Sequence, residues 1–172
     1  MLRKGLVLLI LTGLIHYGIA QDVQIQRIHD LVTEIDQRVF NQEFVGASFQ
    51  DDYGNETIVR AFVQNDHLLK LEAISSNLGG SIQKTYYFSS SKLIMVDVVE
   101  LDHPGLPNWE EAKSDELGAE ELRRVQTVIK NESRFYLQEG VVFKSLSESD
   151  LDGAQQGQIL MMEVDALLRQ LD

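Results

Sequence analysis

The spacing of short polar turns between residues 44 and 101 constrains the fold more than any other feature of the sequence. Stretches in which apolar and polar residues alternate are separated there by segments rich in Gly, Asn, Asp and Ser. Strands joined by such short turns have to pair as antiparallel neighbours. The alternation predicts five strands, at 44–50, 57–64, 68–75, 82–88 and 92–101.

Two further strands are predicted at 133–138 and 141–146, joined by a tight turn. Before them, the segment from His103 to Pro107 holds both prolines of the chain and ends the first meander, because proline removes a backbone donor. We therefore expect an antiparallel, curved meander sheet of about seven strands.

Apolar residues at helical spacing predict three helices. The first covers 22–41 with Asp22 as its cap, the second occupies 109–130, and the last lies near 156–171 behind a turn and cap at 150–153. Together with the strands they predict an α+β fold with an N-terminal, a central and a C-terminal helix packed on one face of the sheet.

Three hairpins share a pattern of an aromatic strand end, a short polar turn and an aliphatic return strand. The strand ends are Ala61-Phe62-Val63, Tyr86-Tyr87-Phe88 and Phe135-Tyr136-Leu137. Over residues 56–146 this pattern resembles hairpins of poorly characterised exported bacterial proteins that combine a helix with a meander. In such proteins the turn often carries Gly before the Lys, whereas Ser91 precedes Lys92 here. The resemblance implies no activity.

The first twenty residues have the three parts of an export signal. Arg3 and Lys4 are basic, residues 6–15 are apolar, and small residues stand at the −3 and −1 positions before a cleavage site between Ala20 and Gln21. We expect residues 1–20 to be a signal peptide and 21–172 a single periplasmic or secreted domain. The apolar run is shorter than the roughly 20 residues of a membrane span. An uncleaved N-terminal anchor is the alternative.

The charge and the lack of cysteine restrict the partners. The chain has 15 basic and 27 acidic residues, and removing Arg3 and Lys4 leaves 13 basic residues and a net charge of −14. Such a charge repels nucleic acid and anionic lipid, so we expect no nucleic-acid partner. After cleavage no further segment is long and apolar enough for a stable membrane span. Without cysteine there are no disulfides, and the core alone has to hold the domain.

No motif for a serine nucleophile, a phosphate loop or a dinucleotide site occurs, so the sequence assigns no catalytic residue, cofactor or metal ligand. One acidic cluster, formed by Asp97, Glu100, Asp102 and His103, has the residue types that bind a divalent cation. Strand alternation argues against it, because Asp97 is expected on the face opposite Glu100 and Asp102.

Aromatic residues on both faces of one predicted strand suggest a binding surface. If helices cover one face only, Tyr87 or Tyr136 stands on the open face, where either ring would anchor a protein or a small ligand. Packing of both rings in the core is the alternative.

These observations favour an exported, non-enzymatic binding or interaction domain whose protein partner or small ligand is unknown. Two alternatives stay open. One is a metal-dependent hydrolase that uses Asp97, Asp102 and His103, and the other is a structural subunit of an envelope assembly.

Overall fold

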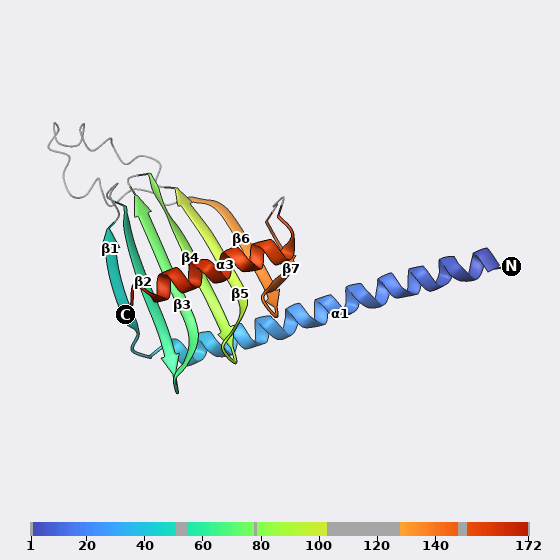
Figure 1. The fold of residues 1–172 in the computed structure, drawn as a ribbon, viewed down its shortest axis with the longest axis horizontal. Helices are drawn as coiled ribbons and strands as arrows, with labels where there is room; N and C mark the ends of the chain where they lie inside the picture. The colour runs from blue at the N-terminus through green and yellow to red at the C-terminus, as the bar shows by residue number, and fades with distance from the viewer. Residues whose placement is uncertain (1, 51–54, 78, 103–127, 148–150, 172) are drawn as a thin grey trace. The chain divides into compact units, whose positions relative to one another are not determined.

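The computed structural model describes residues 2–50, 55–77, 79–102, 128–147 and 151–171 (Figure 1). Its elements in chain order are α1 (Leu2–Val39), β1 (Val45–Gln50), β2 (Glu56–Gln64), β3 (His67–Asn77), β4 (Gly80–Ser89), β5 (Lys92–Asp102), β6 (Val128–Gln138), β7 (Val141–Ser145) and α3 (Gly153–Leu168). The chain divides into two compact units, Met1–Phe40 and Asn41–Asp172.

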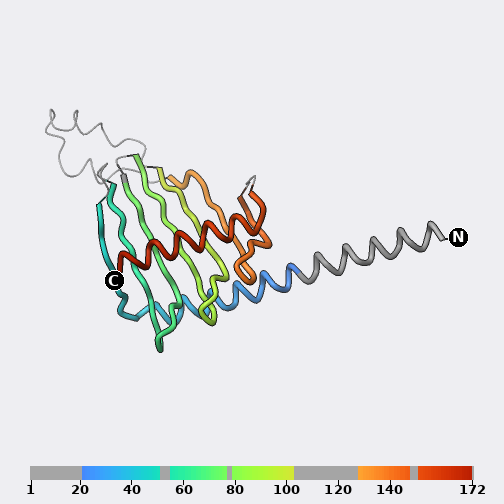
Figure 2. The backbone as a smooth tube through the Cα atoms, viewed as in Figure 1, coloured from blue at the N-terminus to red at the C-terminus, as the bar shows by residue number. Residues whose placement is uncertain are grey.

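The second unit is built on one antiparallel sheet whose seven strands lie in sequence order from β1 to β7, as the tube in Figure 2 shows. The predicted seven-stranded antiparallel meander is therefore confirmed. Strands alternate their side chains between two faces, and local turn chemistry ties each strand to the next, so both signals were readable in the sequence.

Three hairpins use the same device at the same end of the sheet. Their two-residue turns have positive φ at both positions, at Asn65 and Asp66, Ser90 and Ser91, and Glu139 and Gly140. Such turns match the right-handed twist of paired strands. Just before each turn the pairing register shifts, directly after Phe62, Tyr87 and Tyr136. The three aromatic strand ends noted in the sequence are therefore three equivalent positions in the sheet.

Helix α3 crosses one face of the sheet, from β7 toward β1 (Figure 1). Its Leu160 and Val164 pack in one core with sheet residues that all project to this face: Val59, Ala61, Leu71, Tyr86, Phe88, Leu93, Val96, Leu137 and Val142. The helix spans Gly153–Leu168 and so begins three residues before the predicted start near 156, directly behind the predicted cap at 150–153. There the Asp152 carboxylate accepts a hydrogen bond from the Gln155 backbone N–H at 2.8 Å, and Gln155 completes a capping box.

The end of the predicted central helix is wrong. Residues 128–130 begin strand β6, where Val128 pairs with Asp102 and Ile129 with Leu101. Both are β-branched residues, which favour strands, and pairing with the end of β5 outweighs their helical spacing. The rest of that predicted helix, residues 109–127, lies outside the described residues, as do His103 and both prolines.

Helix α1 runs without a break from Leu2 to Val39. The helix predicted over 22–41 is therefore the second part of a longer one, and Asp22 lies inside it and not at its start. The sequence Ala20-Gln21-Asp22 contains neither Pro nor Gly, so nothing there interrupts the helix. Within the described part of the chain, no helix has the length and apolar character needed to cross a membrane.

Candidate functional site

The two tyrosines predicted to face a ligand lie on the sheet face opposite α3. Tyr87 and Tyr136 each pair directly with Met95 between them, so the three side chains form one cross-strand row. Tyr86, by contrast, belongs to the core under α3. Tyr87 is 6% exposed and Tyr136 3%, so neither ring is open to solvent in this arrangement.

A lysine completes the row toward β2. The Lys70 ammonium lies 5.4 Å from the Tyr87 ring centre and 5.9 Å from that of Phe62, and it pairs with Glu72 at 3.0 Å. At the other end, the rings of Tyr136 and Phe143 are 6.3 Å apart and tilted. Cation–π and ring contacts of this kind stabilise a packed surface, so the row already has partners within the sheet.

The acidic cluster is not assembled in the described residues. Arg134 binds both carboxylate oxygens of Asp97, with Nη2 to Oδ2 at 3.0 Å. This hydrogen bonding raises the pKa of Arg134 above its ordinary value, and burial opposes the rise. The register places Glu100 and Asp102 on the opposite face from Asp97.

The same acidic residues line two different cavities. Asp97 lines a hollow of about 240 Å³ near Arg134, whereas Glu100 and Asp102 line another of about 520 Å³ beside Lys130. Across the residues that the structure describes, no group of three or more His, Asp or Glu side chains is placed to hold a metal ion. The fourth predicted member, His103, lies outside that part of the chain.

Sequence reasoning missed a polar cluster between α3 and the sheet. Lys84 on β4 forms an ion pair with Glu163 on α3, and the two side chains are only about 30% exposed. Beside them, the buried Tyr86 hydroxyl makes no hydrogen bond within the described chain. Burial first, and the nearby Glu163 carboxylate second, raise the pKa of Tyr86 above its ordinary value. Lys84 and Tyr86 are two residues apart on β4 and therefore project from the same face. This spacing is the one signal of the cluster that the sequence contains.

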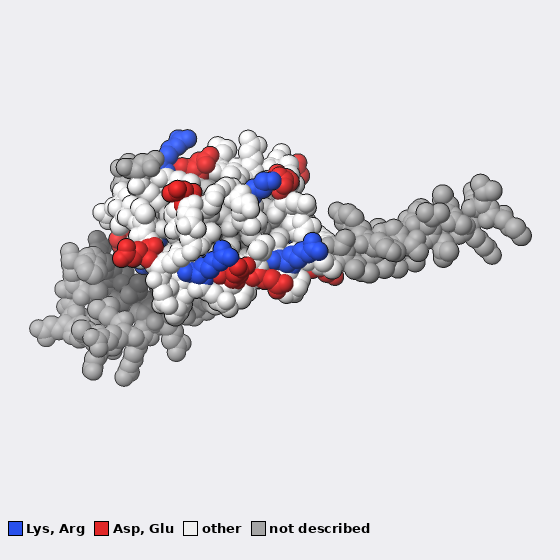
Figure 3. Space-filling model, turned by 90° about the horizontal axis from the view of Figure 1, so that it is seen from below, with Lys and Arg blue, Asp and Glu red and all other residues white. Residues whose placement is uncertain are grey.

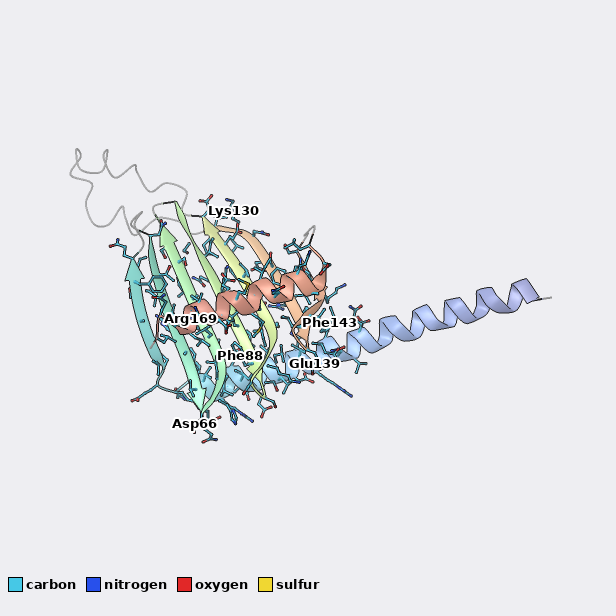
Figure 4. All side chains as sticks on the ribbon, viewed as in Figure 1. Asp66, Phe88, Lys130, Glu139, Phe143 and Arg169 are labelled. Carbon is cyan, nitrogen blue, oxygen red and sulfur yellow. The ribbon has the colours of Figure 1, made fainter. Side chains whose placement is uncertain are left out.

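A cleft of about 580 Å³ lies where the C-terminal end of α3 meets the β2–β3 hairpin and β1. Its apolar lining is Val45, Ala61, Val63, Leu68, Leu168 and Leu171. Asp66, Asp165 and Arg169 also line it, and Figure 4 shows Asp66 at the hairpin tip and Arg169 at the end of α3. We term this the α3-end cleft. No local sequence motif predicts this cleft, because its lining comes from three segments that are distant in the sequence.

The two edges of the sheet differ in cover. At β7 the helix lies on the strand backbone: a Cβ added at Gly157 would meet the Gly140 carbonyl oxygen at 1.9 Å, and one at Gly153 the Val142 carbonyl oxygen at 2.0 Å. At the other edge, β2 is the one described strand that pairs with β1. Phe44 is 51% exposed and Val45 55%, so apolar side chains face solvent where this edge begins.

Acidic and basic side chains are mixed on the face shown in Figure 3, which is typical of a solvated surface. Comparison of the chain with protein-family models, with curated proteins and with solved structures finds no match in any of the three.

Proposed function

We propose that this chain is an exported, non-enzymatic interaction domain that binds its partner along the β1 edge. The observation that carries the proposal is the contrast between the two edges: α3 lies on the backbone of β7, while β1 has no strand of the described residues on its outer side. An open edge presents unpaired backbone N–H and C=O groups, which are the means by which a strand of another chain is bound.

The sequence of β1 supports this role. Its six residues, Val45–Gln50, include no charged residue and no proline, although sheet edges that avoid association usually carry one or the other. Ala47, Ser48 and Gln50 are small or neutral polar residues. A partner strand would therefore meet no charged side chain of β1 itself; the nearest described carboxylate is that of Glu56 on β2, which accepts a hydrogen bond from Ser48 Oγ at 3.0 Å.

Export is supported by the basic, apolar and small-residue parts of the first twenty positions. We expect the protein recovered from outside the cytoplasm to begin at Gln21, as mass spectrometry of its intact chain would show. Recovery of a chain that retains Met1 and stays with the membrane would instead support the uncleaved anchor.

A photo-crosslinking amino acid placed at Ser48 in the producing cell tests the binding site. Gln158, an exposed residue of α3, is the matched control position. We expect adducts of one defined mass at Ser48 and none at Gln158. Equal labelling at both positions, or none at Ser48, would overturn the proposal. Tyr87 and Tyr136 would then be the competing anchors, and binding through them requires that their rings become uncovered.

A further inference from the structure

The chemistry around the β1 edge indicates what kind of segment binds there, if the proposed function is correct. We infer that β1 accepts an extended segment of a partner protein that has an apolar side chain facing the α3-end cleft and cationic residues at its ends. Three features carry this inference: the position of Val45, the charges that flank β1, and the mismatch that a second copy of the chain would meet.

Val45 connects the edge to the cleft. It is the first residue of β1, it lines the α3-end cleft, and it pairs with Ala61 on the face that α3 covers. A strand added beside β1 shares this face at every second residue. One of its side chains would therefore lie next to Val45, within reach of Val63 and Leu171 in the cleft. An apolar side chain fits that lining, because it removes the exposed part of Val63 from water.

Acidic residues flank the edge. Glu43 precedes β1 in the sequence, and Glu56 on the neighbouring strand pairs with Gln50 at the other end of β1. At the cleft, Asp66 and Asp165 outnumber the single cation of Arg169. The whole chain carries a net charge of −12. Lys or Arg at the ends of the bound segment would meet these carboxylates, which gives both attraction and a faster encounter.

A second copy of this chain would be repelled at the β1 edge, where a cationic segment would be attracted. Two identical edges related by a twofold axis pair antiparallel, so the start of one strand lies at the end of the other. Glu43 at the start of one β1 would then approach Glu56, which pairs with Gln50 at the end of β1, in the second copy, and like charges close to one another destabilise a strand pair. The charges therefore favour a cationic partner over a homodimer.

Short synthetic peptides test this inference with the full chain. The probes are Lys-Val-Thr-Leu-Thr-Val-Lys with blocked ends, the same peptide with Glu at both ends, and the Lys peptide with alternate backbone nitrogens methylated. We expect the Lys peptide to bind about tenfold tighter than the Glu peptide at low salt, with the difference shrinking at high salt. Methylation should abolish binding, because it removes the main-chain donors of the added strand.

A matched pair of valines locates the apolar anchor. Val63 in the cleft is 46% exposed and Val141 on β7 is 44% exposed. We expect Val63→Thr to weaken binding of the Lys peptide about fivefold and Val141→Thr to leave it unchanged. Equal effects, or tighter binding of the Glu peptide, would overturn the inference.

The outcomes separate the inference from the proposed function. Crosslinks at Ser48 without binding of any peptide would keep the interaction domain and reject the cationic segment. A concentration-dependent dimer in sedimentation, with crosslinks between copies at Ser48, would identify a second copy as the occupant and also reject it. Absence of crosslinks at Ser48 would reject the proposed function itself.

Discussion

The two edge strands of the sheet, β7 and β1, differ in whether their outer side is covered. At β7, α3 begins so close to the strand that neither Gly153 nor Gly157 has room for a side chain. At β1, no strand of the described residues pairs with the outer side, and Val45 is more than half exposed. An uncovered edge exposes a protein to aggregation, and covering it with a helix is a common protection. The fold therefore closes one edge and leaves β1 available to a strand of another chain.

The largest expected effect comes from disturbing the closed edge. In Gly157→Ala, the new Cβ would lie 1.9 Å from the Gly140 carbonyl oxygen, so the helix has to move away from β7. We expect a loss of about 3 kcal/mol in the free energy of unfolding, measured with urea. The control is Gln158→Ala on the exposed side of the same helix, with an effect below about 0.5 kcal/mol. Equal stability of both variants would show that α3 is not packed closely against the backbone of β7.

A smaller effect is expected where α3 is attached to the middle of the sheet. Glu163→Gln removes the ion pair with Lys84, which is largely shielded from solvent, and we expect a loss of about 1 kcal/mol. The control is Glu139→Gln, since Glu139 pairs with Lys92 at 2.7 Å in an exposed position where such pairs contribute little. A loss that is no larger in Glu163→Gln than in the control would contradict the attachment.

Tyr86→Phe changes the same region between α3 and the sheet, but here we expect a gain in stability and not a loss. The Tyr86 hydroxyl is buried without a hydrogen bond to the described residues, so its removal should raise the free energy of unfolding by up to about 1 kcal/mol at pH 7. Because the pKa of Tyr86 is raised in the folded state, its ionisation favours the unfolded chain: below pH about 10 this effect is absent, and above it the free energy of unfolding falls as the pH rises.

Unfolding in urea between pH 8 and pH 11 measures this dependence. Wild type should lose stability more steeply than Tyr86→Phe above pH about 10, because only the wild-type unfolded chain gains from ionising this tyrosine. Parallel pH profiles of the two proteins would show that Tyr86 titrates alike in the folded and unfolded states.

The comparison of edges also shows what the sequence could and could not reveal. The meander, its turns and the cap at Asp152 were predicted because alternation, turn residues and capping are local signals. The placement of Tyr86 and Tyr87 on opposite faces followed from the same alternation. Residues 128–130 were misassigned, because a short β-branched run fits either a helix or a strand until its pairing is known.

The parts that remained hidden depend on distant segments. Lys84 and Glu163 are 79 residues apart, and the α3-end cleft joins β1, the β2–β3 hairpin and the end of α3. The closeness of Gly157 to Gly140 follows from where α3 crosses the sheet, which no spacing in the sequence encodes. The near-complete burial of Tyr87 and Tyr136 likewise belongs to the packed structure.

The smallest stability effect, and the most direct test of the open edge, comes from charge at Ser48. This residue is exposed in the middle of β1, and its hydroxyl donates to Glu56 at 3.0 Å. Because this hydrogen bond is exposed, Ser48→Lys, which can pair with Glu56, and Ser48→Glu, which repels it, should each change the free energy of unfolding by less than about 0.5 kcal/mol. Their effects on binding of the Lys peptide should have opposite signs, because Glu adds to the acidic surroundings of β1 and Lys opposes them. Lys144→Glu on β7 is the control and should leave the affinity unchanged. If both Ser48 variants bind as wild type does at low salt, the bound segment does not lie along β1; if Lys tightens binding, its charge preference is the reverse of the one inferred here.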